Sequence, residues 1–323
     1  MKAIQTLNGD LVWREADEPP LGPGEVRIEN HATAVNRADL AQRAGGYPPP
    51  PGASPILGLE CAGVVTAVGE GVSRVAAGDE VCALLAGGGY AETVVVAAGQ
   101  VLKKPAGLNF EEAASIPEVF ATAYLNLYME ARLARGEYAV IHTGASGVGT
   151  AAIQMCAAFG NPAFVTAGSQ EKIDRCIEFG ADAGLNRHEG EFAGAVGKWT
   201  DGRGADVILD PVGGAYLAAN LASLATDGRL VIIGLLGGAS AEVALGTMMV
   251  KRLRIIGSTL RARSIAAKAT VMDALQERVW PLLENGTIRP VIERVYSIKE
   301  AGDAHELIAG NQTFGKVVLR IRS

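Results

Sequence analysis

Hydrophobic and polar positions follow two different patterns along the chain, and the change between them comes near Glu118. Before that point, short segments alternate apolar and polar residues, as in Val26-Arg27-Ile28-Glu29, and Pro-Gly, Gly-Asp and Gly-Gly turns separate them. Alternation with a period of two is typical of strands that bury one face. The pattern predicts a compact β-rich domain over residues 1–120.

Beyond residue 120, strongly apolar runs alternate with helical stretches, which begin with a helix expected over 121–134. Apolar runs without alternation are expected where helices cover both faces of a parallel sheet. The pattern therefore predicts an α/β domain over residues 121–262. The strands expected in this domain are 138–142, 163–166, 205–210, 229–234 and 254–258.

The last segment, 263–323, begins with a long helix expected over 265–284. Apolar and polar residues alternate again in 291–296 and 316–321, in the same pattern as in the N-terminal domain. We expect this segment to return to that domain. The predicted fold class is therefore α/β, with a parallel layer and a second, β-rich domain.

Composition and charge narrow the classes of function. The 323 residues, 49% of them hydrophobic, can bury substantial cores, whereas the net charge of −6 offers no broad positive field for nucleic acid or an anionic membrane. Residues 1–10 lack the basic and apolar parts of a leader, and no apolar run approaches the roughly 20 residues of a membrane span. A cytoplasmic protein is expected.

The four cysteines are Cys61, Cys82, Cys156 and Cys176. They lie far apart and form no Cys-x-x-Cys pair, so the sequence suggests neither a disulfide framework nor a thiolate zinc site. Buried free thiols are the simplest interpretation for most of them.

A glycine-rich turn follows the first strand of the α/β domain. It runs Gly144-Ala145-Ser146-Gly147-Val148-Gly149 and leads into a helix expected to end at Gly160. Glycines allow a tight turn and close packing of helix on strand, and the free N–H groups at the helix start attract a pyrophosphate. Ser146 stands where the fingerprint Gly-x-Gly-x-x-Gly has its middle glycine. We interpret the turn as a dinucleotide site formed by Gly144, Ser146, Gly147, Val148 and Gly149, although tight-turn geometry alone also requires glycines.

The end of the second strand indicates which dinucleotide binds. An NAD-selective site usually places a carboxylate about 20 residues past the glycine turn, on the ribose 2′-hydroxyl. Here Gly168 and Ser169 leave room instead, and Lys172 and Arg187 can meet a 2′-phosphate. The sequence therefore favours NADPH over NADH. The alternative is that Lys172 and Glu171 are solvated charges at a helix start.

Segments spread from end to end of the chain carry a family resemblance. They are Asn36-Arg37-Ala38-Asp39, Gly58-Leu59-Glu60-Cys61-Ala62-Gly63, Gly78-Asp79-Glu80-Val81, the glycine turn, Thr166-Ala167-Gly168-Ser169-Gln170 and Asp210-Pro211-Val212-Gly213-Gly214. With them the chain resembles the medium-chain dehydrogenase/reductases, in particular the zeta-crystallin-like quinone oxidoreductases. It is most similar to their tumour-suppressor-inducible branch, through the run from Asn36 through Tyr47 to Pro55 and the Ser-Gly-Val-Gly form of the turn.

The resemblance implies a Rossmann dinucleotide-binding domain and a GroES-like β-rich catalytic domain. It also raises the question of zinc, because the superfamily includes zinc alcohol dehydrogenases. Catalytic zinc there uses a cysteine near position 36 and a Gly-His-Glu triplet, whereas Asn36 and Leu59 here supply neither thiolate nor imidazole. No cysteine lies between Leu84 and Val101 to build the structural zinc lobe. We therefore expect no metal, and a structural role for Glu60.

A site without metal loses the Lewis acid that polarises a simple ketone, so its acceptor must take hydride unaided, as quinones do. The resemblance places this acceptor in the cleft between the domains, beside Asn36, Tyr47 and the loop 234–238. The Tyr47 ring can stack on a flat acceptor while its hydroxyl donates to a carbonyl oxygen. Alternatively, Tyr47 packs on the run Pro48–Pro51 and Asn36 satisfies local backbone groups.

The resemblance implies further cofactor contacts from Val212, Gly234, Leu235 and Leu260. The contact of Leu260 is expected to be made by its backbone. Beyond them, Arg261 and Arg263 are interpreted as part of a solvated face rather than a basic patch. The apolar edge expected at 254–258 leads us to expect a homodimer, as is common in the family.

The sequence thus favours an NADPH:quinone oxidoreductase that transfers hydride directly, without flavin or metal, to quinones such as 1,2-naphthoquinone. A neighbouring alternative is an NADPH-dependent reductase of enone or alkenal double bonds. An alternative of another class is a non-catalytic NADPH-binding protein, similar to the crystallin-like or RNA-binding relatives of the family. The negative net charge disfavours the RNA-binding version.

Overall fold

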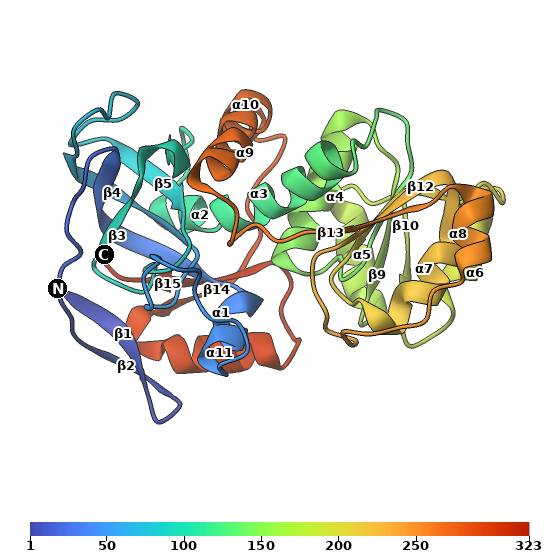
Figure 1. Ribbon diagram of the computed structural model, residues 1–323, viewed down its shortest axis with the longest axis horizontal. Helices are drawn as coiled ribbons and strands as arrows, with labels where there is room; N and C mark the ends of the chain where they lie inside the picture. The colour runs from blue at the N-terminus through green and yellow to red at the C-terminus, as the bar shows by residue number, and fades with distance from the viewer. Residues whose placement is uncertain (323) are drawn as a thin grey trace. The chain divides into compact units, whose positions relative to one another are not determined.

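The computed structural model describes residues 1–322 and divides the chain into two compact units. The first unit comprises Met1–Ala121 together with Leu260–Ser323, and the second comprises Thr122–Thr259. The first is built on a mixed sheet, antiparallel except for one parallel pair of strands, and the second on a parallel sheet (Figure 1). The predicted α/β fold class is confirmed.

The first unit is a seven-stranded sheet in the order β14-β15-β3-β4-β5-β7, with β6 paired to β3, and a separate β1-β2 hairpin. Strand β15 runs antiparallel to β3, with Val317 opposite Val35, so the C-terminal strands complete the N-terminal sheet. The strands are β1 (Lys2–Leu7), β2 (Asp10–Glu15), β3 (Glu25–Val35), β4 (Glu60–Val68), β5 (Glu80–Leu84), β6 (Thr93–Ala97), β7 (Val101–Lys103), β14 (Ile292–Ser297) and β15 (Lys316–Arg320).

The first unit also contains helices, of which α1 and α11 lie side by side (Figure 1), while the last residues of α3 already belong to the second unit. These helices are α1 (Arg37–Arg43), η1 (Ala98–Gln100), α2 (Phe110–Ala114), α3 (Pro117–Tyr124), α9 (Ile265–Arg278), α10 (Trp280–Glu284), η4 (Ile298–Glu300) and α11 (Ala301–Ala309). The single helix expected over 265–284 was wrong: it breaks at Val279, because Pro281 in the first turn of α10 has no N–H to continue α9. Trp280 then donates its indole N–H to the Lys103 carbonyl oxygen at 2.8 Å, which ties α10 to β7.

The second unit is a six-stranded parallel sheet in the order β10-β9-β8-β11-β12-β13. Its strands are β8 (Ala139–Ile141), β9 (Ala163–Ala167), β10 (Ala183–Asn186), β11 (Ala205–Asp210), β12 (Leu224–Ile232) and β13 (Arg254–Gly257). The connecting helices are α4 (Gly147–Phe159), α5 (Gln170–Glu178), α6 (Phe192–Trp199), η3 (Gly214–Tyr216), α7 (Leu217–Ser223) and α8 (Leu245–Lys251). Because the strands are parallel, their carboxyl ends share one edge of the sheet, where ligands of such sheets bind.

Two elements of this unit differ from the sequence expectation. Strand β10 was missed, because it is short and contains Gly184 and Asn186 at the edge of the sheet. The helix expected over 121–134 is instead α3 followed by a π-helical segment, Leu125–Glu130. The Asn126 side chain donates to the Thr122 carbonyl oxygen at 2.7 Å, and a side chain that takes such an acceptor competes with the regular helical hydrogen bond.

All four cysteines are buried free thiols, as the sequence predicted. Across residues 1–322, no helix has the length and apolar character needed to cross a membrane.

Candidate functional site

The glycine turn lies at the carboxyl end of β8 and starts α4. Gly144 donates its N–H to the Thr166 carbonyl oxygen at 2.9 Å, which holds the turn against β9. Ser146, the departure from the fingerprint, is the N-cap residue of α4, and its hydroxyl accepts the Gly149 N–H at 3.0 Å. The capping serine leaves the preceding N–H groups of the helix start, those of Gly147 and Val148, without an acceptor in the described part of the chain. Such a start suits a pyrophosphate.

The two outer glycines of the turn are required by close packing. A Cβ atom on Gly149 would lie 2.4 Å from the Gly144 carbonyl oxygen. A Cβ atom on Gly144 would lie 2.9 Å from the Val165 Cβ and 3.2 Å from the Cys176 Sγ. Close packing and phosphate binding therefore both require glycine at positions 144 and 149, and the two explanations are compatible.

The ends of β9 and β10 bring together the residues expected at the 2′-phosphate. Ser169 is the N-cap residue of α5 and accepts the Lys172 N–H at 3.3 Å. Arg187 donates its backbone N–H to Ala167 at 2.9 Å, and its guanidinium lies 3.2 Å from where a Gly168 Cβ would be. Within residues 1–322 the Arg187 side chain forms no ion pair. The structure thus presents an exposed, uncompensated guanidinium directly over Gly168.

The turn after β11 and the loop after β12 are also joined at this edge of the sheet. Gly237 donates its N–H to the Val212 carbonyl oxygen at 2.7 Å, and Gly214 donates to Gly238 at 2.9 Å. These bonds place Val212 next to the loop that carries Gly234 and Leu235. Leu235 is 57% exposed, so it presents an apolar side chain beside the carboxyl ends of the central strands.

A buried polar chain beneath this edge was not predicted as a unit. His142 contacts the Thr166 hydroxyl at 3.0 Å and the Asn220 Oδ1 at 2.7 Å, and Asn220 donates to Asp210 at 2.9 Å. Burial lowers the pKa of His142 to about 4, so its imidazole is neutral at pH 7. Asp210 in turn accepts the Val212 N–H at 2.6 Å. The chain fixes the ends of β8, β9 and β11 relative to one another, which gives His142 a structural role.

Leu260 is the first residue of the C-terminal part of the first unit, and its side chain is 5% exposed. A contact of its backbone with the cofactor stays a prediction.

In the first unit, Asn36, which stands where the zinc enzymes have a cysteine, bridges a buried ion pair between Glu60 and Lys316. The Lys316 Nζ lies 2.7 Å from the Glu60 Oε1, with the two side chains 4% and 0% exposed. Asn36 links them: its Nδ2 donates to the Glu60 Oε1 at 2.9 Å, and its Oδ1 accepts from Lys316 at 2.7 Å. The other Glu60 oxygen accepts the backbone N–H of Glu118 at 2.8 Å. Asn36 therefore does more than satisfy local backbone groups.

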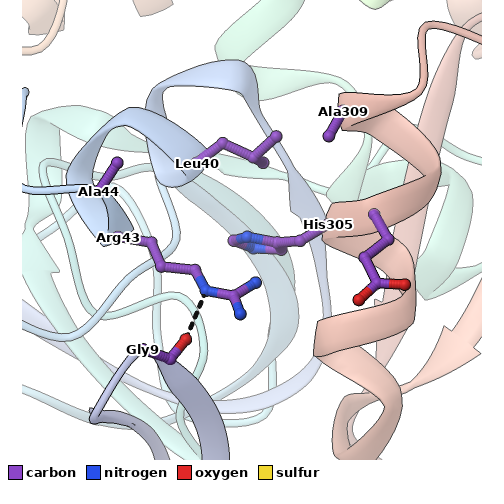
Figure 2. A pocket seen from close by; sticks show the side chains of 7 residues that line it. Gly9, Leu40, Arg43, Ala44, His305 and Ala309 are labelled. Atoms are coloured by element: carbon purple, nitrogen blue, oxygen red, sulfur yellow. Dashed lines mark hydrogen bonds between the residues drawn. The ribbon is translucent and has the colours of Figure 1, made fainter.

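A second hydrogen-bonded chain leads from this cluster toward the surface. The Asp39 carboxylate accepts the N–H groups of Asn36 and Gly58, and the Tyr90 hydroxyl lies 3.4 Å from it and 3.0 Å from the His305 Nε2. Burial raises the pKa of Asp39 to about 6 and lowers that of His305 to about 4. His305 belongs to α11, and its side chain points toward α1 and lines a cavity of about 290 Å³ with Arg43 (Figure 2).

Tyr47 contacts a buried arginine. The Arg261 guanidinium carbon is 5.2 Å from the centre of the Tyr47 ring, and its Nη1 donates to the Tyr47 carbonyl oxygen at 3.2 Å. Arg261 also donates to the Gln42 Oε1 at 2.6 Å and the Ala86 carbonyl oxygen at 2.8 Å. The interpretation of Arg261 as a solvated charge was wrong, because its side chain is 3% exposed and bonded to three separate segments.

Comparisons with known proteins extend this picture. The family model "Alcohol dehydrogenase GroES-like domain" matches residues 22–106, and "Zinc-binding dehydrogenase" matches residues 147–277. The solved quinone oxidoreductase of Pseudomonas syringae pv. tomato DC3000 is 30% identical, with a TM-score of 0.86 over 99% of both chains. The chain belongs to the medium-chain dehydrogenase/reductases. It is thus an NAD(P)-dependent oxidoreductase with the predicted GroES-like and Rossmann parts.

Other proteins are similar to this chain to a comparable degree. A mycobacterial protein solved in complex with NADPH is 29% identical, with a TM-score of 0.87 over 99% of this chain and 100% of that one. The JamJ enoyl reductase is 26% identical, with a TM-score of 0.84 over 96% and 95% of the two chains. A mycocerosic acid synthase-like polyketide synthase of Mycobacterium tuberculosis is 32% identical over 321 residues. That match covers 97% of this chain but 15% of the synthase, so the chain spans a small part of such relatives.

The residues of this chain do not fit the zinc that part of its family binds. Leu59 is a buried apolar residue, Asn36 offers an amide, and Glu60 is already neutralised by the Lys316 ammonium group. Zinc prefers thiolate, imidazole and carboxylate ligands gathered around one point. Among residues 1–322 no three or more His, Cys, Asp or Glu side chains are so gathered.

Proposed function

We propose that this chain reduces quinones with NADPH, by direct hydride transfer and without zinc or flavin. The observation that carries the proposal is the Lys316–Glu60 ion pair, bridged by Asn36, which stands where the zinc enzymes have a cysteine. A site so arranged has no Lewis acid to polarise an alcohol or a simple ketone. Its acceptor must be one that accepts hydride readily by itself.

NADPH would be held by the second unit. The helix start at Gly147 and Val148 suits the pyrophosphate, and the Arg187 guanidinium over Gly168 suits the 2′-phosphate. The NADPH complex of a mycobacterial relative supports this choice. When bound, NADPH supplies the hydride.

The acceptor would contact Tyr47 in the first unit. Arg261 fixes the Tyr47 ring and backbone, so the ring offers an ordered face for stacking and a hydroxyl for an acceptor oxygen. Asn36 has a different role in this proposal. Both N–H groups of its amide are donated, to Glu60 and to the Ala34 carbonyl oxygen, so Asn36 acts as a positioning residue for the ion pair.

A second candidate is reduction of the C=C bond of enones or enoyl thioesters. It is favoured by the JamJ enoyl reductase and the polyketide synthase among the relatives. Such an acceptor also takes hydride unaided, at its β-carbon, but its α-carbon must then receive a proton. The two candidates therefore differ in how much they depend on an acid in the site.

Oxidation of NADPH should be measured with 1,2-naphthoquinone, 1,4-benzoquinone and a small enone, after dialysis against a chelator. We expect turnover that the chelator does not change, with a higher kcat/KM for a quinone than for the enone. A preference for the enone would favour the second candidate. Tight NADPH binding without turnover of any acceptor would overturn both and favour the non-catalytic alternative.

We further propose that the chain forms a homodimer and that it belongs to the zeta-crystallin-like, tumour-suppressor-inducible branch. Strand β13 pairs only with β12 in the described part of the chain, which leaves one edge of the sheet open. Beside it, α8 exposes Leu245, Met249 and Val250 by 72%, 76% and 73%. A second copy would pair this edge and cover this apolar face.

A further inference from the structure

Glu118 lies in the first turn of α3, directly beside Glu60. Its backbone N–H donates to the Glu60 Oε2 at 2.8 Å, so two carboxyl groups from β4 and α3 share one region of the first unit. Two neighbouring carboxyl groups rarely ionise together, and their surroundings decide which one keeps its proton.

The surroundings of these two carboxyl groups are unequal. Glu60 accepts hydrogen bonds from the Asn36 amide and the Glu118 N–H and pairs with the Lys316 ammonium group, all of which stabilise its ionised form. The buried Oε2 of Glu118 has no hydrogen-bond partner among residues 1–322. Glu60 therefore has a cation and hydrogen-bond donors around it, whereas the buried oxygen of Glu118 has no such partner.

Electrostatics point the same way. Burial, followed by the negative charge of Glu60, raises the pKa of Glu118 to about 8, so it is protonated at pH 7. The charged or titratable groups that act on it from the surrounding elements are Glu60 of β4, Lys316 of β15, Asp39 of α1, Arg261, Lys268 of α9 and Tyr47. Two of these, Arg261 and Tyr47, form the stacked pair beside which the acceptor is proposed to bind.

We propose that the Glu118 carboxyl group is the proton donor of the reduction. The proposal rests on the proposed function. The acceptor gains two electrons and one hydrogen as hydride from NADPH and becomes an anion. The O–H bond of Glu118 then breaks, and its proton forms an O–H bond on a hydroquinone anion or a C–H bond at the α-carbon of an enolate. Glu118 is left as a carboxylate, which takes a new proton from water.

Asp39 is a poorer donor, although its pKa is also raised. Its side chain is fully buried, and it accepts two backbone N–H groups that stabilise the carboxylate. Glu118, unlike Asp39, is not fully buried as a residue, although its Oε2 is buried. No signal in the sequence singles out Glu118, since an acidic residue after proline is ordinary at a helix start.

The test is Glu118→Gln, which keeps the size of the side chain and the neutral charge of the acid but removes its proton. An enolate is a much stronger base than a hydroquinone anion and depends more on a nearby acid. We therefore expect kcat to fall about 10²-fold with an enone acceptor and clearly less with 1,2-naphthoquinone. Wild-type kcat/KM for the enone should also fall above pH about 8, where Glu118 ionises, and Glu118→Gln should lack that limb.

Two further variants separate the chemical role from a structural one. Glu118→Asp keeps an acid and should recover part of the enone activity together with the alkaline limb. Glu111→Gln, the same change at a surface ion pair with Arg320, should leave both unchanged. An active wild type whose rates and pH profile are unaltered in Glu118→Gln would overturn this inference but not the proposed function. A wild type inactive with every acceptor would overturn the proposed function itself.

Discussion

Replacing Lys316 by Met tests whether the buried ion pair stabilises the first unit. The variant leaves the Glu60 carboxylate, which is 0% exposed, without the ammonium group that lies 2.7 Å from it in the wild type. Removing one partner of such a pair typically costs 3–5 kcal/mol, because the other charge stays buried and uncompensated. We expect the free energy of unfolding to fall by about 4 kcal/mol.

The assay is urea unfolding followed by tryptophan fluorescence, since Trp13 and Trp280 lie in the first unit. With a urea dependence of about 1–3 kcal/mol/M, the expected loss lowers the midpoint by more than about 1 M. Lys299→Met, at an exposed position, is the matched control and should change stability by less than about 0.5 kcal/mol.

A double variant separates the unpaired charge from lost packing. Glu60→Gln combined with Lys316→Met removes both charges, so we expect it to be more stable than Lys316→Met alone. The reasoning is refuted if Lys316→Met loses less than about 1 kcal/mol, or if the double variant is no more stable than the single one.

Three other outcomes follow from the second unit. Arg187→Ala should weaken NADPH binding at least about 10-fold and leave NADH binding nearly unchanged, because a charge-assisted hydrogen bond contributes about 1.5–3 kcal/mol. Isothermal titration calorimetry measures both affinities. An equal loss of affinity for the two cofactors would contradict the prediction. Gly149→Ala should lower the free energy of unfolding by about 1–3 kcal/mol and weaken NADPH binding, since the new Cβ meets the Gly144 oxygen at 2.4 Å. A midpoint of thermal unfolding equal to that of the wild type would argue against this. Met249→Lys should shift the chain from dimer to monomer in light scattering after size-exclusion chromatography, and an unchanged mass would count against dimerisation through α8.

The fold was predictable wherever local pattern and burial agree. The apolar run of β11 was located at Ala205–Asp210, because both faces of a central parallel strand are covered. Strand β10 lies at the edge of the sheet and has a weak apolar pattern, so it gave little signal. The break between α9 and α10 depended on Pro281, whose effect on a long helical pattern was not weighed.

The candidate site also has residues that the sequence could predict and residues that it could not. The glycine turn and the Gly168 region could be predicted as a cofactor site because their chemistry follows the order of residues along the chain. Arg261 was misjudged because its partners, Gln42, Tyr47 and Ala86, lie far away in the sequence. The pairing of Glu60 with Glu118 was missed for the same reason, since only the folded first unit brings β4 and the start of α3 together.

The burial of all four cysteines acquires a further meaning in light of the chemistry proposed for this chain. Quinones and enones are electrophiles that alkylate proteins at thiolate sulfur, which is far more nucleophilic than the thiol. Burial raises the pKa of every cysteine here, so each is held as the unreactive thiol and out of reach of small molecules. A catalyst that handles such compounds at every turnover thereby avoids becoming their target.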